Sequence, residues 1–160
     1  MPTGQCLVIG IGNADRGDDA VGRVVARKLS TRRIPGVRVL EQGGEAAGLL
    51  DGLSGAQAAY LIDAARSGRL PGTISRFDAA AMELPRIAFG CSTHGLGLAE
   101  AIELARALGQ LPHRCVVYAI EGRAYDIGAP LSPEVATAAE AVARMIADEM
   151  RGFVRDEGAG

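Results

Sequence analysis

The stretch that most constrains the fold runs from residue 6 to residue 22 and reads CLVIGIGNADRGDDAVG. Residues 6–9 form a short uninterrupted apolar run, which is typical of a strand buried on both faces of a sheet. Gly10 and Gly12 break this run, and apolar residues recur at helical spacing from Val21 onward. A strand, a glycine turn and a helix in this order predict an α/β domain that binds its ligand at the end of that strand.

Three aspartates lie in the loop between the predicted strand and helix: Asp15, Asp18 and Asp19. Carboxylates at a helix start are stabilised by the helix dipole, but they repel a pyrophosphate. The glycine spacing also departs from GxGxxG, because the next glycine after Gly12 is Gly17. The loop therefore favours a cation or an electrophile over a phosphate. A simpler role stays open, in which Asp18 and Asp19 only cap the helix, since Asp is a preferred capping residue.

The composition leads us to expect one soluble, cytoplasmic α/β domain. The chain has 160 residues, a formal charge of −2 and 4% aromatic residues without tryptophan, so we expect neither nucleic acid nor a membrane as a partner. We expect the domain to span residues 1–151, a flexible tail to follow at 152–160, and the protein to be a cytoplasmic monomer. Cys6 and Cys115 fall on predicted strands, where buried and inert thiols are expected.

The remaining pattern alternates strands and helices, which implies parallel strands joined by right-handed crossovers. We predict a single three-layer domain with a twisted, mostly parallel five-stranded sheet and helices on both faces. The segment from 73 to 77 is expected to be an antiparallel edge strand, and residues 78–93 a long loop. The predicted strands are 6–9, 37–41, 58–62, 73–77 and 114–120, and the predicted helices are 18–31, 46–53, one opening at 93–95 and one opening at 132–133.

Three candidate ligands fall at the edge where the parallel strands of this sheet end. The strands that lead into Gly12 and Asp63 are expected to be neighbours at the point where the strand order reverses, and the long loop brings His94 to the same edge. Asp19, Asp63 and His94 are therefore expected to converge. Two carboxylates and one imidazole suit a divalent metal such as nickel or zinc, with a position left open for substrate.

Simpler roles stay open for these side chains and their neighbours. Asp63 could cap the following turn, and His94 could hydrogen-bond a backbone carbonyl. His113 is expected to be a surface histidine, and Cys91 a small apolar loop residue. No GxSxG motif is present, which disfavours an α/β-hydrolase nucleophile. At the same edge we expect Glu45 and Glu121 to be solvated carboxylates. Arg66 and Arg123 could bind a carboxylate or help to dock a partner.

Five motifs, in order, resemble those of the nickel–iron hydrogenase maturation proteases. The first is GIGNADRGDDAVG, followed by VLEQGGEAAGLL, LIDA, STHGLGL and GAPLSPEV. Together they extend over about residues 5–150. The fold of that family is a twisted five-stranded sheet between helices, in a phosphorylase/hydrolase-like arrangement.

The resemblance implies an endopeptidase that removes a short carboxy-terminal extension from the precursor of the hydrogenase large subunit after nickel insertion. Asp19, Asp63 and His94 match the family's catalytic and metal-binding residues. They would engage nickel presented by the substrate, so the free enzyme need not hold a permanent metal. The residues that would shape the cleft are Asn13, Gly43 and Gly44.

The sequence departs from the family pattern at Gln42 and Glu45, where an aspartate and a threonine are common, and at Ala20, where glycine is frequent. These departures bear on the identity of the substrate. Two alternatives from other classes stay open. One is a non-catalytic nickel-checkpoint or binding module, and the other is a nucleotide-binding α/β domain with Glu41 or Glu45 as the ribose-binding acid.

Overall fold

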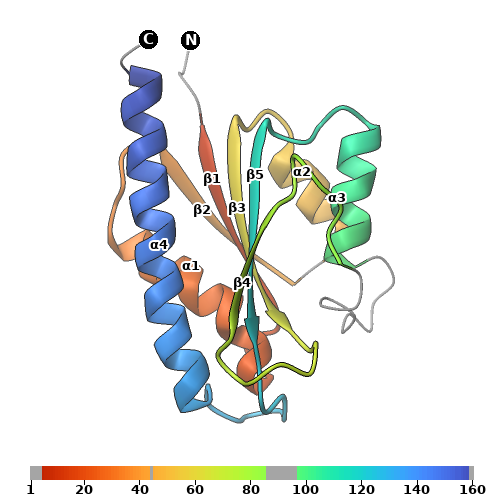
Figure 1. Ribbon diagram of the computed structural model, residues 1–160, viewed down its shortest axis with the longest axis vertical. Coiled ribbons are helices and arrows are strands. Elements are labelled where there is room, and N and C mark those ends of the chain that lie inside the picture. Colours follow the sequence, from red (N-terminus) through yellow and green to blue (C-terminus); the bar gives the residue numbers. More distant parts are fainter. Residues whose placement is uncertain (1–4, 44, 86–96, 159–160) are drawn as a thin grey trace.

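The computed structural model describes residues 5–43, 45–85 and 97–158, which form a sheet between two layers of helices (Figure 1). The strand order is β2-β1-β3-β5-β4, and only β4 runs antiparallel to its neighbour. The predicted fold class is therefore confirmed. The strands are β1 (Cys6–Ile11), β2 (Val37–Gln42), β3 (Ala58–Ala65), β4 (Ile74–Asp78) and β5 (Arg114–Glu121).

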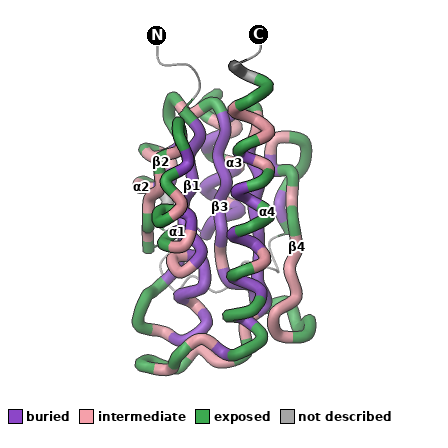
Figure 2. Tube along the Cα trace, turned by 90° about the vertical axis from the view of Figure 1, so that its left-hand side faces the viewer, coloured by how far each residue is buried: buried purple, intermediate pink, exposed green. Residues whose placement is uncertain are grey.

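Each face of the sheet has its own apolar core. Alternate residues of a strand point to opposite faces, so Val8 of β1 packs with one pair of helices and Ile9 with the other. Figure 2 shows β1 and β3 buried along most of their length, while β4 at the edge is mostly half-buried or exposed. One face is covered by α1 (Val21–Thr31) and α4 (Pro133–Gly158), and the other by α2 (Ala46–Leu53) and α3 (Leu98–Ala107).

The strand order reverses between β1 and β3, as predicted. β1 pairs with β2 on one side and with β3 on the other, and the helices that follow β1 and β2 lie on opposite faces. A ligand-binding crevice is expected outside the carboxyl ends of the strands at such a point. We call this end of the sheet the carboxyl edge; it is the lower end in Figure 1.

Two glycines allow the start of α1 to lie directly against β1. A Cβ atom at Gly10 would be 2.3 Å from the Gly22 carbonyl oxygen, and one at Gly22 would be 2.2 Å from the Ile62 carbonyl oxygen. Such distances leave no room for a side chain at either position. The close approach brings the short 3₁₀ helix η1 (Gly17–Ala20), which precedes α1, against the end of β3.

Two of the element boundaries that differ from the predicted ones bear on the candidate site. β3 continues past Asp63 to Ala65, because its pairing with β5 extends to Ala65 opposite Glu121, so Asp63 lies within a strand. α3 begins at Leu98, with Gly97 as its N-cap residue, rather than at 93–95. Cys91 and His94 lie outside the described residues.

The last helix is longer than expected. The structure shows helix from 133 to 158, whereas we expected a flexible tail from 152. Phe153 explains the difference, because it packs against the apolar core and lies under the Arg114 guanidinium, 5.8 Å from the ring centroid. None of the described helices has the length and apolar character needed to cross a bilayer.

Both cysteines on strands are buried and unpaired, as predicted. Burial raises the pKa of the Cys6 thiol to about 11 and that of Cys115 to about 12. These thiols remain protonated at neutral pH and are poor nucleophiles.

Replacing Gly22 by Ala should lower the free energy of unfolding by about 3 kcal/mol, because the new methyl group meets backbone that cannot move aside. Urea denaturation followed by circular dichroism measures this change. Gly152→Ala is the matched control in α4, where a Cβ meets nothing within 4 Å. It should stabilise the protein by about 0.5–1 kcal/mol. Equal effects at the two positions would contradict the described packing.

Candidate functional site

The carboxylate of Asp19 is held by the glycine turn that follows β1. Its Oδ2 atom accepts a hydrogen bond of 2.9 Å from the Asn13 backbone N–H. Gly12 has a φ of +143°, which L side chains rarely adopt, and a Cβ there would be 1.9 Å from the Asp19 carbonyl oxygen. The turn and η1 are therefore in direct contact, and the Asp19 side chain is partly exposed at the carboxyl edge.

Asp63 lies on the neighbouring strand β3 at the same edge. It points to the same face as Leu61 and Ala65, which belong to the core beneath α2 and α3. Its Oδ1 atom accepts a 2.8 Å hydrogen bond from the Ala64 N–H. Burial raises the pKa of Asp63 to about 8, and the negative charge of Asp19 contributes to the increase.

The structure thus brings Asp19 and Asp63 together, as the sequence predicted. Burial and the charge of Asp19 both disfavour the ionised form of Asp63, and a bound cation would favour ionisation of the pair. The third predicted ligand, His94, lies outside the described residues, as does Gly44. Within the described part of the chain, no group of three or more His, Cys, Asp or Glu residues could hold a metal by itself.

Asp18, the neighbour of Asp19, has a different role. It is fully buried, and its carboxylate accepts hydrogen bonds from the backbone N–H groups of Arg123, Ala124 and Ser132 and from the Ser132 hydroxyl. Burial alone would raise the pKa of Asp18, but these hydrogen bonds outweigh it and lower the pKa below its ordinary value. Asp18 ties η1 to the loop between β5 and α4, a role that we did not predict.

Glu121 at the end of β5 was expected to be solvated, and this prediction is wrong. Only 3% of the residue is exposed. Its carboxylate accepts hydrogen bonds from the backbone N–H groups of Ser67 and Arg69 and from the Ser67 hydroxyl. Glu121 therefore closes the loop after β3 onto the end of β5. Buried N–H groups need a hydrogen-bond acceptor, and the Glu121 carboxylate supplies it to this loop.

The other predicted edge residues contribute to the shape of the turns. The Asn13 side chain accepts a 2.9 Å hydrogen bond from the Asp15 N–H, which fixes the loop after β1. Gly43 and Glu45 are exposed. Arg66 lies over the Tyr125 ring, 3.7 Å from its centroid, and Arg123 pairs with Glu134 at 3.3 Å. Both arginines thus have partners within the protein.

The side chain of Gln42 packs against α2. Its Nε2 atom donates to the Gly48 carbonyl oxygen at 2.9 Å, and a Cβ at Gly48 would be 3.1 Å from Gln42 Oε1. The missing side chain at Gly48 makes room for this contact. Gln42 therefore has a clear packing role next to the second glycine turn.

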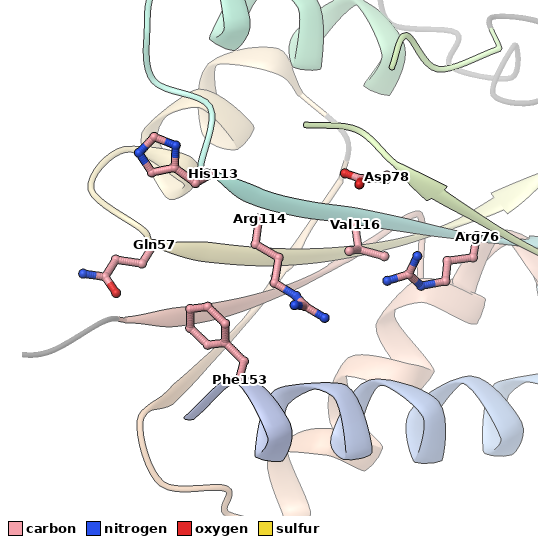
Figure 3. A pocket seen from close by; sticks show the side chains of 7 residues that line it. All are labelled: Gln57, Arg76, Asp78, His113, Arg114, Val116 and Phe153. Atoms are coloured by element: carbon pink, nitrogen blue, oxygen red, sulfur yellow. The ribbon is translucent and has the colours of Figure 1, made fainter. Parts of the chain in front are cut away.

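A cavity of about 600 Å³ lies at the opposite end of the sheet (Figure 3). It is lined by residues that include Arg76, Arg114, the exposed His113 and Phe153. Both arginines pair with the single carboxylate of Glu149 of α4, which compensates part of their positive charge. The cavity contains neither of the predicted carboxylates, and the candidate site remains at the carboxyl edge.

Comparison with known proteins identifies the family of this chain. The family model HycI, described as hydrogenase maturation protease, matches residues 23–149. The chain belongs to the hydrogenase maturation protease family. The match includes the positions of Asp63 and His94 and begins just after Asp19. This membership gives no support to the nucleotide-binding alternative.

A curated protein with a related name is similar to this chain in sequence. The chain is 29% identical to the hydrogenase expression/formation protein HupD of Thiocapsa roseopersicina over 136 residues, which cover 82% of this chain and 61% of that protein. The alignment therefore spans about three fifths of the length of this curated relative.

Solved structures of family members have the same fold. A hydrogenase maturation protease HybD from Thermococcus kodakarensis is 26% identical, with a TM-score of 0.70 and coverage of 91% of this chain and 98% of that chain. The maturating endopeptidase HybD from Escherichia coli is 24% identical, with a TM-score of 0.76 and coverage of 93% of both chains.

Replacing Asp18 by Asn should lower the free energy of unfolding by about 3 kcal/mol. The amide supplies one acceptor oxygen where four donors converge, and its NH₂ group would face at least one of them. Chemical denaturation at pH 7 measures the change. Asp15→Asn, three residues earlier on the exposed part of the loop, should change stability by less than about 0.5 kcal/mol.

The contribution of Asp18 to the free energy of unfolding should decrease as the pH falls. Its pKa is lowered in the folded state, so the stability that it contributes is complete above its unfolded pKa of about 4 and is lost as the pH falls through the folded pKa. The difference in stability between wild type and Asp18→Asn should be constant from pH 7 to pH 5 and shrink below about pH 4. A difference that grows on acidification would contradict this account.

Proposed function

We propose that this protein is an endopeptidase that removes the carboxy-terminal extension from the precursor of the large subunit of a nickel–iron hydrogenase. Asp19, Asp63 and His94 engage the nickel that the precursor already carries. The nickel is part of the substrate, so recognition of the ion also reports that metal insertion is complete.

The observation that carries this proposal is the juxtaposition of two carboxylates at the carboxyl edge. Asp19 lies in η1 and Asp63 in β3, and the negative charge of Asp19 adds to the effect of burial in raising the pKa of Asp63. Oxygen donors together with an imidazole are suitable ligands for nickel. Membership in the hydrogenase maturation protease family supports the endopeptidase activity.

The chain's own residues have separable tasks in this proposal. Asp19 is oriented by the Asn13 N–H, and Asp63 by the Ala64 N–H. Among the described residues, each of the two side chains has a donor to one carboxylate oxygen only, and we expect the other oxygen to bind the ion. At Gly43 a Cβ would meet only Nη2 of Arg23, at 4.0 Å, and we expect the substrate segment to run along this open side of the second turn. Bound nickel supplies positive charge that can anchor the substrate or polarise the scissile carbonyl.

Several finer features belong to the same proposal. We expect the enzyme to act as a cytoplasmic monomer and to hold no permanently bound metal in the absence of its substrate, while Ni²⁺ added in excess can still occupy the site. A non-catalytic nickel checkpoint on the same fold would bind the loaded precursor without shortening it, so the experiment below separates the two functions.

Incubation of the protein with candidate large-subunit precursors, with and without nickel, tests the proposal. Mass spectrometry should show loss of a carboxy-terminal peptide from the nickel-loaded precursor only. Binding without any mass loss would support the checkpoint function, and equal cleavage of nickel-free precursor would contradict a role for the ion.

His94→Ala should abolish processing of the nickel-loaded precursor while the circular dichroism spectrum and thermal midpoint stay unchanged. The chain has two histidines, which provides a matched control. His113→Ala, at the exposed rim of the opposite cavity, should process at the wild-type rate. Normal cleavage by His94→Ala would rule out the assignment of this residue.

A further inference from the structure

The peptide group between Gly12 and Asn13 is held from both sides by charged side chains. Its carbonyl oxygen accepts a hydrogen bond of 2.6 Å from Nε of Arg23. Its N–H donates to Oδ2 of Asp19 at 2.9 Å. One peptide plane therefore connects the guanidinium of Arg23, on the first turn of α1, with the carboxylate of Asp19.

Arg23 lies at the junction of the two glycine turns. Its side chain is 25% exposed, and Nη1 is 3.8 Å from Oε1 of Glu41. Its Nη2 atom is 4.0 Å from the position that a Cβ of Gly43 would occupy. The first turn is also tied directly to β2, because the Gly12 N–H donates to the Gln42 carbonyl oxygen at 3.0 Å.

We propose that Arg23 is a positioning residue that acts on Asp19 through the Gly12–Asn13 peptide, holding the carboxylate with one oxygen turned to its backbone donor and the other free for nickel. This inference rests on the proposed function, since it assigns a support to one of the proposed nickel ligands. Arg23 itself need not touch the ion or the substrate.

The physical basis is polarisation and orientation of one peptide group. A cation at the carbonyl oxygen withdraws electron density from the peptide and strengthens its N–H as a donor. Among the described residues, no donor reaches Oδ1 of Asp19, so the hydrogen bond at Oδ2 determines which oxygen stays available. The groups that orient a metal ligand commonly change metal affinity about 10- to 100-fold when they are removed.

Arg27 provides a matched control on the same helix. It is exposed and pairs with the same Glu41 carboxylate, with its Nε atom 3.0 Å from Oε1. Arg27→Met removes the same charge one turn further along α1 without altering the Gly12–Asn13 peptide. Any effect of Arg23→Met that Arg27→Met lacks is therefore due to the contact with Gly12.

The first measurement is the Asn13 amide signal in ¹H–¹⁵N correlation spectra of the full chain. Arg23→Met should move this amide proton upfield and speed its exchange with solvent about tenfold, while Arg27→Met leaves both unchanged. Arg23→Lys, which keeps a cation but not the planar donor, should recover part of the shift. Thermal melts identify any variant that fails to fold.

The second measurement is the affinity for Ni²⁺ alone by titration calorimetry. Arg23→Met should weaken binding about tenfold, and Arg27→Met should not. In an Asp19→Asn background, Arg23→Met should weaken binding by less than about twofold, because both changes act on the same ligand.

The two measurements separate the possible failures. If the Asn13 amide of a folded Arg23→Met protein matches that of Arg27→Met, the positioning role is overturned. Additive losses in the Asp19→Asn background overturn it as well. If the wild type binds no Ni²⁺, the nickel-binding role of Asp19 in the proposed function is contradicted, and the amide spectrum still decides the effect of Arg23 on the turn.

Discussion

The close approach of α1 to β1 and β3 determines the geometry of the candidate site. Gly10 and Gly22 leave no space for side chains between strand and helix, so the backbones pack directly. The residues just before the helix are then held against the end of β3, where Asp63 lies. The packing of two glycines thus places Asp19 beside a carboxylate that is 44 positions away in sequence.

The consecutive residues Asp18 and Asp19 have different roles at the carboxyl edge. Asp18 is buried and saturated with backbone and hydroxyl donors, so it joins η1 to the loop before α4. Asp19 is partly exposed at the carboxyl edge, and its carboxylate accepts one hydrogen bond from the described part of the chain. Glu121 closes the loop after β3, so Asp18 and Glu121 together fix the loops at the carboxyl edge next to Asp19 and Asp63.

The sequence predicts the fold well because its signals are local: apolar runs, glycine turns and helical periodicity. It also predicts that β1 and β3 are neighbours, which brings Asp19 to Asp63. The roles of Asp18, Glu121 and Arg23 depend on contacts between distant segments, and spacing alone does not contain them. The length of α4 was underestimated for the same reason, because Phe153 finds its partner in Arg114 of another element. Whether His94 joins the two aspartates stays a prediction.

The most direct test of the central claim is anomalous X-ray diffraction at the nickel edge, on crystals of the protein soaked with Ni²⁺. We predict one strong peak between the carboxylates of Asp19 and Asp63, with a nitrogen of His94 at a ligand distance of about 2.0–2.2 Å. The peak should disappear in crystals of Asp19→Asn. The account would be contradicted if crystals soaked at a saturating Ni²⁺ concentration showed no anomalous peak at the carboxyl edge. It would also be contradicted if the His94 side chain pointed away from both aspartates.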